Sequence, residues 1–294
     1  MIGQRVLSGC AVALLLLVVP SVRGAQDPLP VFSVAGNQAS VVLLGSVHMA
    51  YETLYPLRPA IEEAFSAADA LVVEVDVSGT NGARIQQLFL EQGTLPPGQS
   101  LQDQLSDESL TALEAYLSRR SLALEHFEGL KPGLLVLSLS SLRLEEFGLD
   151  MRWGIEQHFL RQLAPAQAVL ELESAEQQVA LLLDFPEADQ LLAQNLRELE
   201  QAENTLLPIY RAWLDGDLDE LDRLLLREER AANPEFEPVY ERLYDQRNAA
   251  MAARVQELLA GEGRYFVIVG AGHLVGERGI IRLLERAGFS LQPL

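Results

Sequence analysis

Residues 41–48 read Val41-Val42-Leu43-Leu44-Gly45-Ser46-Val47-His48, an apolar run that a glycine closes and a histidine follows three residues later. Residues 265–273 repeat this plan as Tyr265-Phe266-Val267-Ile268-Val269-Gly270-Ala271-Gly272-His273. The chain has four histidines, and two of them occupy this frame. An apolar run of about five residues that ends at a glycine is typical of a strand buried on both faces, as in a parallel sheet covered by helices. We therefore expect an α/β fold with a mostly parallel central sheet flanked by helices.

The two histidines are candidates for one shared site. In open α/β sheets, ligands bind beyond the carboxyl ends of the strands, and neighbouring strands lie about 4.8 Å apart. His48 and His273 each follow such a strand, so both imidazoles are expected at one edge, where they can share an ion or a substrate. The alternative is that each histidine simply occupies a turn, because the pattern Gly-x-x-His is short. Two copies in matching contexts favour the shared site.

A further strand is expected at residues 70–76, Ala70-Leu71-Val72-Val73-Glu74-Val75-Asp76, and it carries two carboxylates. An expected helix at residues 59–65 precedes this strand. The apolar run at residues 41–44, this helix and this strand together form the strand-helix-strand crossover of a parallel sheet. Because side chains alternate along a strand, Glu74 and Asp76 are expected on the same face. A carboxylate in so apolar a strand is costly unless a cation pairs with it. Either a buried salt bridge or a metal or active-site cation explains Glu74, and Asp76 is the next candidate.

Three more side chains are candidates near this edge. Glu173 ends an expected strand at residues 168–173, whereas Asp150 is placed either to cap a helix or to serve the site. Arg247 falls on the apolar stripe of an expected helix. A guanidinium that points inward needs an anionic partner. That partner is either a structural carboxylate such as Asp76 or Glu173, or a substrate carboxylate or transition-state oxyanion.

The N-terminus has the pattern of a secretory signal peptide over residues 1–24. A short basic start is followed by an apolar segment at residues 11–19, then by Pro20 and small residues up to Gly24. The apolar segment is too short for a comfortable membrane span, and no second segment of spanning length follows. Cys10 precedes the apolar segment instead of following it, which argues against lipidation. We expect a periplasmic or secreted protein that is not integral to a membrane after cleavage; an uncleaved anchor is the alternative.

Composition limits the chemistry of the expected mature chain, residues 25–294. Cys10 is the only cysteine, so metal ligands must be histidine or carboxylate side chains. The formal net charge is −20, and it becomes −22 without Arg5 and Arg23, which argues against nucleic acid or anionic lipid as a partner. The length suits one domain, with a helical insertion expected at about residues 186–261, where Leu, Ala, Glu, Gln and Arg dominate.

Together these motifs resemble the TraB/GumN family, which is related to the Tiki proteases and more distantly to the erythromycin-esterase (EreA) and ChaN-like proteins. The resemblance rests on motifs in a fixed order: Gly45-Ser46-Val47-His48, Val72-Val73-Glu74-Val75-Asp76, Gly148-Leu149-Asp150, Leu170-Glu171-Leu172-Glu173, Arg247-Asn248 and Val269-Gly270-Ala271-Gly272-His273. It covers nearly all of residues 25–294 and implies an EreA/ChaN-like fold. In Tiki-like members the two Gly-x-x-His histidines and a strand glutamate are taken to form a metal-dependent peptidase centre.

The resemblance implies that His48, His273 and Glu74 bind a divalent ion. Manganese, cobalt and zinc are all compatible with these ligands. The expected reaction is hydrolysis of a peptide or a small ester or amide, with Arg247 stabilising the oxyanion and with Asp76, Asp150 or Glu173 as base or supporting group. One alternative is a metal-free hydrolase like the erythromycin esterases, in which a histidine and a glutamate activate water. The other is a non-enzymatic periplasmic binding or regulatory protein that holds haem, as ChaN-like relatives suggest. The substrate and the oligomeric state are not indicated.

Overall fold

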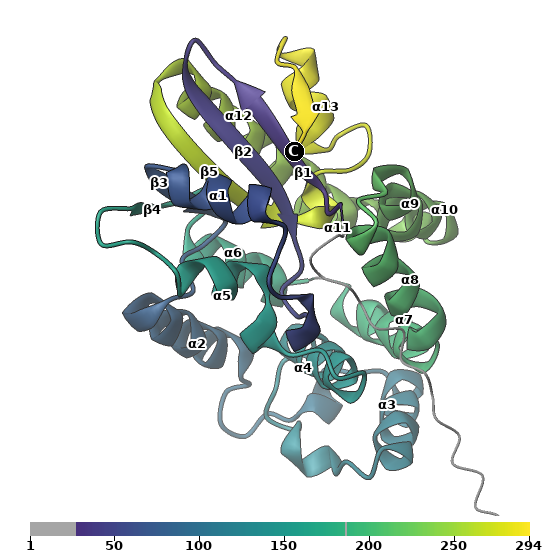
Figure 1. Ribbon diagram of the computed structural model, residues 1–294. Helices are drawn as coiled ribbons and strands as arrows, with labels where there is room; N and C mark the ends of the chain where they lie inside the picture. The colour runs from purple at the N-terminus through teal and green to yellow at the C-terminus, as the bar shows by residue number, and fades with distance from the viewer. Residues whose placement is uncertain (1–27, 186) are drawn as a thin grey trace, which may run out of the picture.

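The computed structural model describes residues 28–185 and 187–294, so the signal peptide expected at residues 1–24 lies outside the described residues. The described chain is a mixed α/β structure with one six-stranded sheet and helices around it (Figure 1). The order of strands across the sheet is β4-β3-β5-β2-β1-β6. In chain order, the strands are β1 Val31–Ala35, β2 Gln38–Ser46, β3 Ala70–Val73, β4 Ala168–Glu171, β5 Glu262–Gly270 and β6 Leu291–Pro293.

Four neighbouring strands of the sheet, β4, β3, β5 and β2, run parallel. At the other edge, β1 is antiparallel to β2, and β6 is antiparallel to β1. The mixed α/β class and the mostly parallel sheet are therefore confirmed. The longest pairing is between β2 and β5, in which Gly45 lies opposite Val269 and Ser46 opposite Gly270. The two Gly-x-x-His segments therefore leave the sheet side by side.

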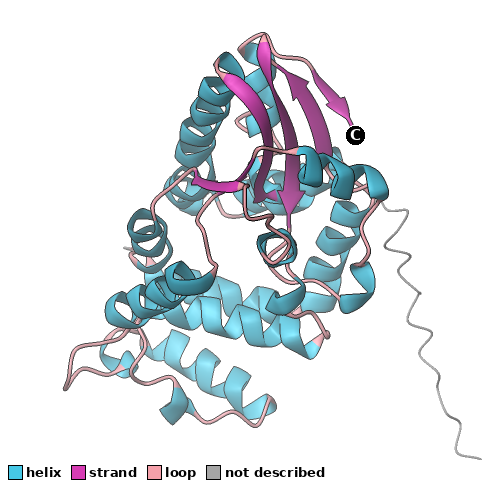
Figure 2. Ribbon diagram, turned by 60° about the vertical axis from the view of Figure 1, so that its left-hand side comes forward, coloured by secondary structure: helices cyan, strands magenta, loops and turns pink. Residues whose placement is uncertain are grey.

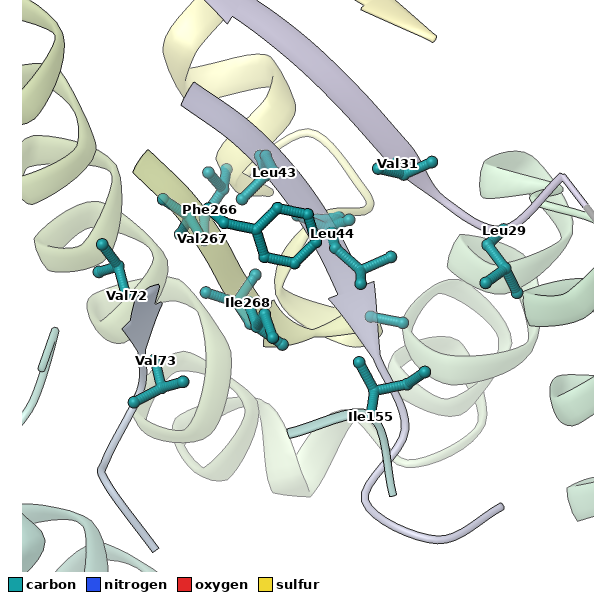
Figure 3. Packing of buried hydrophobic residues seen from close by; sticks show 14 of the residues in the cluster. Leu29, Val31, Leu43, Leu44, Val72, Val73, Ile155, Phe266, Val267 and Ile268 are labelled. Atoms are coloured by element: carbon teal, nitrogen blue, oxygen red, sulfur yellow. The ribbon is translucent and has the colours of Figure 1, made fainter. Parts of the chain in front are cut away.

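The strands β3, β5 and β2 lie in the middle of the main apolar core, which explains their apolar sequences, whereas β4 at the edge of the sheet is only partly buried. Figure 3 shows Leu43 and Leu44 of β2 beside Phe266 and Val267 of β5, and all four side chains are fully buried. Helices cover both faces of the sheet: α1 lies in front of it in Figure 1, and α12 and α13 lie behind it. A buried strand of this kind gains roughly 1.5–3 kcal/mol for each large apolar side chain removed from water.

The helices have unequal lengths and include several short segments in the second half of the chain (Figure 2). Their bounds are α1 Pro59–Ala67, α2 Gly79–Gly93, α3 Asp107–Arg119, α4 Pro132–Glu146, α5 Ile155–Leu160, α6 Ala175–Leu183, α7 Ala188–Glu200, α8 Ala202–Leu214, α9 Leu218–Asp222, α10 Glu228–Ala232, α11 Glu237–Tyr240, α12 Gln246–Ala260 and α13 Ile280–Arg286. Side chains cap several of them; Ser174 and Gln177, for example, form a capping box at the start of α6. None of the helices in the described part of the chain is long and apolar enough to cross a membrane.

A second apolar cluster lies away from the sheet, between α3, α4 and α7. Its fully buried members include Leu113, Leu135 and Leu192, one from each helix. The helices within residues 186–261 are thus divided between two cores, because α7 joins this cluster whereas α12 packs on the sheet through Met251 and Val255. This arrangement places α4, α6 and α7 next to the segment that leads into α12.

Candidate functional site

The carboxyl ends of the four parallel strands meet at one edge of the sheet, and each is followed by a polar candidate side chain. Across the sheet, Glu173 follows β4, Glu74 follows β3, His273 follows β5 and His48 follows β2. Four segments that are far apart in the sequence therefore deliver two carboxylates and two imidazoles to neighbouring positions. This is the place where open α/β sheets bind their ligands.

Glu74 lies just beyond the end of β3 and is buried. Its Oε1 atom accepts a hydrogen bond from the backbone N–H of Gly270 at 2.7 Å. Its Oε2 atom accepts from Nη2 of Arg247 at 2.7 Å and from Nε2 of Gln178 at 3.0 Å. Burial opposes ionisation of Glu74, but the positive charges of His273 when it is protonated, of Arg247 and of His48, together with the hydrogen bond from Gly270, outweigh it and hold the pKa of Glu74 below its usual range. The carboxylate is therefore charged and held in one orientation by three donors.

Arg247 is the cation that balances two carboxylates, the buried Glu74 and the half-buried Glu173. Its Nε donates to Oε1 of Glu173 at 2.7 Å, and its Nη2 donates to Oε2 of Glu173 at 3.0 Å as well as to Glu74. Nη1 donates to the carbonyl oxygen of Leu243 at 3.1 Å. Four of the five N–H groups of this guanidinium are thus engaged within the protein. The sequence left open whether Arg247 pairs with a structural carboxylate or with a substrate or transition-state group. In the structure, Arg247 pairs with the structural carboxylate of Glu173.

His273 is buried and has one ring nitrogen fixed by a hydrogen bond. Its Nδ1 lies 2.6 Å from Oδ1 of Asn248, whose Nδ2 donates to the carbonyl oxygen of Arg278 at 3.0 Å. Because that second bond turns the Asn248 oxygen toward the ring, Nδ1 carries the proton and Nε2 carries a lone pair. Nε2 lies 3.7 Å from Oε1 of Glu74. Burial lowers the pKa of His273 to about 4, so its imidazole is neutral near pH 7.

His48 lies in the loop after β2, where 69% of its side chain is exposed. Its Nδ1 is 3.0 Å from Oε1 of Glu156 in α5, and the hydroxyl of Ser46 donates to the same oxygen. The negative charge of Glu156 raises the pKa of His48 to about 9, so its imidazole is protonated near pH 7. The loop is held closely against α5, because a Cβ atom at Gly154 would lie 2.3 Å from the carbonyl oxygen of His48.

Glu156 is the site residue that the sequence analysis missed. It is 110 residues from Ser46 and stands in the first turn of a short helix, where acidic residues are common for electrostatic reasons alone. The only local signal is Gly154, two residues earlier, which permits the close approach of the His48 loop. Without the tertiary structure, nothing in the sequence pairs Glu156 with His48.

Asp76 and Asp150 do not contact the buried carboxylates. The strand β3 ends at Val73, so the alternation of side chains does not extend to Asp76. Its carboxylate accepts hydrogen bonds from Ser78 and Asn81 at the start of α2 instead. Asp150 caps the short 3-10 turn at Met151–Trp153 and pairs with Arg152. The helix α5 begins one turn later, with Gly154 as its N-terminal cap residue.

At this edge of the sheet, two side-chain atoms are separated by a distance that suits two ligands of one divalent ion. Within residues 28–185 and 187–294, no three histidine, cysteine or carboxylate side chains are grouped closely enough to form a complete metal site. However, Nε2 of His273 and Oε1 of Glu74 face each other at 3.7 Å. Two ligand atoms on a tetrahedral ion with bonds of about 2.1 Å lie about 3.4 Å apart. The pair therefore fits half of a metal site, and His48 stands across the same edge.

The fold and this edge together define an α/β protein whose polar site lies beyond the carboxyl ends of parallel strands. A model of the TraB/PrgY/gumN family matches residues 30–293, and the chain belongs to this family. It is 29% identical to an uncharacterised protein YbaP of Shigella flexneri over 270 residues, which cover 90% of this chain and 96% of that protein. YbaP of Escherichia coli K12 is also 29% identical, over 83% of this chain and 87% of its own length. An uncharacterised protein of Treponema pallidum is 24% identical, over 94% of this chain and 86% of that protein. No solved structure matches the chain significantly.

Proposed function

We propose that this member of the TraB/PrgY/gumN family is a metal-dependent hydrolase that cleaves an amide or ester bond in a peptide or small substrate. The proposal rests on one observation: Nε2 of His273 and Oε1 of Glu74 face each other at 3.7 Å, and both atoms are hydrogen-bond acceptors. Two facing acceptors repel each other unless a cation or a hydrogen-bond donor lies between them, and a cation also balances the charge of the carboxylate. The distance is too long for a direct hydrogen bond, so a shared proton does not explain the arrangement.

The groups around this pair support a metal site because they hold each ligand in the required state. Asn248 keeps the proton of His273 on Nδ1, which is the arrangement found behind metal-bound histidines. Arg247 and Gln178 keep Glu74 charged and oriented through its other oxygen, Oε2. His48 is the proposed third ligand, and manganese, cobalt and zinc are the proposed ions. When bound, such an ion supplies Lewis acidity toward water and toward a carbonyl oxygen.

Glu156 is proposed to hold His48 in the state that a metal ligand needs. A histidine that binds a metal through Nε2 must be neutral with its proton on Nδ1, and Oε1 of Glu156 lies 3.0 Å from Nδ1 of His48, where it can accept a hydrogen bond from that N–H. Arg247 is proposed to hold Glu74 and Glu173 in place, because these carboxylates and Leu243 already engage four of its N–H groups.

We further propose that the protein acts outside the cytoplasm, in the periplasm or after secretion. The support is the signal-peptide pattern of residues 1–24, with its basic start and apolar centre. Fractionation of cells that express the full chain, followed by N-terminal sequencing, tests this. A mature chain that begins near Ala25 in the periplasm supports the proposal, whereas a full-length chain in the cytoplasm contradicts it.

The hydrolase is tested with purified residues 25–294, fluorogenic peptides and p-nitrophenyl esters. We expect a chelator to abolish turnover, one divalent ion to restore it, and His273→Ala to remove it. Asp76→Asn is the matched control, because Asp76 lies at the start of α2 and its loss is expected to leave turnover unchanged. Turnover of no substrate in the panel with any of the three ions would argue against the hydrolase.

A metal-free hydrolase is the second candidate, and the contact between His48 and Glu156 favours it. This pair stands at the exposed end of the edge, where a histidine and a glutamate can activate water without a metal. The same assay separates the two mechanisms. Turnover that survives the chelator and depends on both His48 and Glu156 supports the metal-free mechanism and contradicts the metal-dependent one.

A further inference from the structure

The proposed hydrolase needs a hydrogen-bond donor for the oxyanion, and Arg247, the residue expected in this role, is already engaged. When water adds to a carbonyl carbon, the electron pair of the C=O bond moves onto the oxygen, and a donor aimed at that oxygen lowers the barrier. Four N–H groups of Arg247 are bound to two carboxylates and a backbone carbonyl instead. The side-chain amide of Gln178 likewise donates to Glu74. A donor from another residue at this edge of the sheet is therefore needed.

Tyr244 lies against the second Gly-x-x-His segment, at the same edge. The centroid of its ring is 5.5 Å from that of His273, with an angle of 46° between the ring planes. A Cβ atom at Gly272 would lie 2.9 Å from Cε1 of Tyr244 and 3.7 Å from Cζ, the carbon that bears the hydroxyl. Gly272 therefore allows the hydroxyl end of the tyrosine ring to lie directly on the turn that carries His273.

A π-helical turn positions this tyrosine. The turn spans Glu241–Asp245, and the backbone N–H of Gln246 closes it by donating to the carbonyl oxygen of Glu241. Such turns are rare and frequently occur at functional sites. Arg247 follows Tyr244 by three residues, a spacing that places two side chains on the same face of a helix. The tyrosine and the arginine therefore approach the edge of the sheet together.

The hydroxyl of Tyr244 is a donor that the protein does not use. No group among the described residues forms a hydrogen bond with it, and those residues do not enclose the hydroxyl oxygen completely. Burial of the ring raises the pKa of Tyr244, and the charges of Arg247 and Glu74 also act on it. The hydroxyl is therefore protonated near pH 7, and it is close to the ion pair between Arg247 and Glu74.

We propose that the hydroxyl of Tyr244 donates a hydrogen bond to the oxyanion that forms from the scissile carbonyl group, which makes Tyr244 a catalytic residue. This inference rests on the proposed hydrolase. When the tetrahedral intermediate collapses, the electron pair on the oxygen re-forms the C=O bond and the bond to the leaving group breaks. The leaving group takes up the proton that the attacking water released, so Tyr244 keeps its own proton throughout.

Tyr244→Phe keeps the ring and removes the hydroxyl, so it separates hydrogen-bond donation from packing against His273. With residues 25–294, a divalent ion and p-nitrophenyl acetate, we expect kcat to fall about 100-fold and KM to change less than about twofold. Tyr240→Phe is the matched control. It removes the same atom one turn earlier, from a ring that contacts Arg230, and is expected to keep the kcat of the wild type. A wild-type kcat in Tyr244→Phe would overturn the role of Tyr244.

Calorimetry tests the same contact without turnover. The probe is p-nitrophenyl methylphosphonate, in which a tetrahedral anionic group replaces the carbonyl group of the substrate. With the ion bound, Tyr244→Phe is expected to bind this probe about tenfold more weakly than the wild type does, because a charge-assisted hydrogen bond is lost. The affinity of Tyr244→Phe for the ion itself should equal that of the wild type, because the ring still packs against His273.

The outcomes distinguish a failure of this role from a failure of the hydrolase. Equal phosphonate binding by Tyr244→Phe and the wild type would overturn the role of Tyr244 alone. Loss of ion binding in Tyr244→Phe would also overturn it, since the hydroxyl would then support the metal site and not the oxyanion. A wild type that turns over no substrate contradicts the hydrolase, and the role of Tyr244 with it.

Discussion

Nε2 of His273 lies 3.7 Å from Oε1 of Glu74, although one residue follows β5 and the other follows β3. Each side chain is held by other groups: Asn248 fixes the imidazole, and the backbone of Gly270 together with Arg247 fixes the carboxylate. The short distance is thus maintained by hydrogen bonds to other groups, of which only the bond from Gly270 involves a facing atom, Oε1 of Glu74. This is the arrangement expected of a preorganised ligand site.

Asn248→Ala is predicted to weaken binding of a divalent ion about 10- to 100-fold, because His273 loses the partner that fixes its tautomer. Calorimetric titration of the ion measures this effect, and ¹⁵N NMR of the ring nitrogens reports the tautomer. Asn81→Ala removes the same atoms at an exposed position that contacts Asp76, and it serves as the control. Ion affinity within about twofold of the wild type in Asn248→Ala would show that Asn248 has no such role.

Arg247→Met is predicted to lower the free energy of unfolding by about 3–5 kcal/mol, because it leaves the buried carboxylate of Glu74 and the half-buried carboxylate of Glu173 without their cation. Urea unfolding followed by circular dichroism measures the change. Arg264→Met is the matched control, since its pair with Asp69 is exposed and should contribute less than about 1 kcal/mol. A loss of less than about 1 kcal/mol in Arg247→Met would mean that the three groups do not form a coupled buried network.

Much of the arrangement of Glu74, Glu173, Arg247 and His273 can be predicted from local sequence patterns. The apolar runs of β2, β3 and β5 identify buried parallel strands, and the residues after them must meet at one edge. The inward direction of Arg247 follows from helical periodicity in the same way. The sequence does not predict that Arg247 pairs with Glu173 and not with Asp76, because β3 ends at Val73 and the chain bends at Glu74. Asp76 then binds the start of α2.

The contacts of His48 depend on tertiary packing and could not be predicted. Glu156 reaches His48 only because residues 150–155 pair with the loop after β2, through the backbone bonds between Ala50 and Asp150 and from Ile155 to Val47. The last strand shows a smaller effect. The backbone N–H of Phe289 still bonds to the carbonyl oxygen of Leu284 near the end of α13, so β6 begins only at Leu291.

His48 and His273 are predicted to titrate at different pH values in ¹H–¹⁵N NMR. His48 should titrate near pH 9, because the charge of Glu156 stabilises its imidazolium. Glu156→Gln is expected to return the pKa of His48 toward about 6.5, the ordinary value for histidine. Added salt should lower the pKa of His48 in the wild type, since its side chain is exposed and solvent ions screen the pair. A pKa of His48 near 6.5 in the wild type would exclude the ion pair.

The burial of His273 predicts a loss of stability in acid. Its pKa is about 4 in the folded state and about 6.5 when unfolded, so below pH 6.5 the unfolded chain binds more protons. The contribution of neutral His273 is fully present above about pH 6.5, decreases as the pH falls to about 4, and is constant below that. The free energy of unfolding of the wild type should therefore fall by about 3 kcal/mol more than that of His273→Gln between pH 7.5 and 4. Parallel curves for the two proteins would contradict a buried neutral His273.

The most direct test of the proposed metal site is calorimetric titration of manganese, cobalt and zinc into metal-stripped residues 25–294, with His273→Ala and Glu74→Gln as variants. We predict that at least one ion binds at one per chain with a Kd below about 0.1 mM, and that each variant abolishes this binding while its circular dichroism stays native. No binding tighter than about 0.1 mM by the wild type, or equal binding by wild type and variants, would contradict the metal site formed by His273 and Glu74.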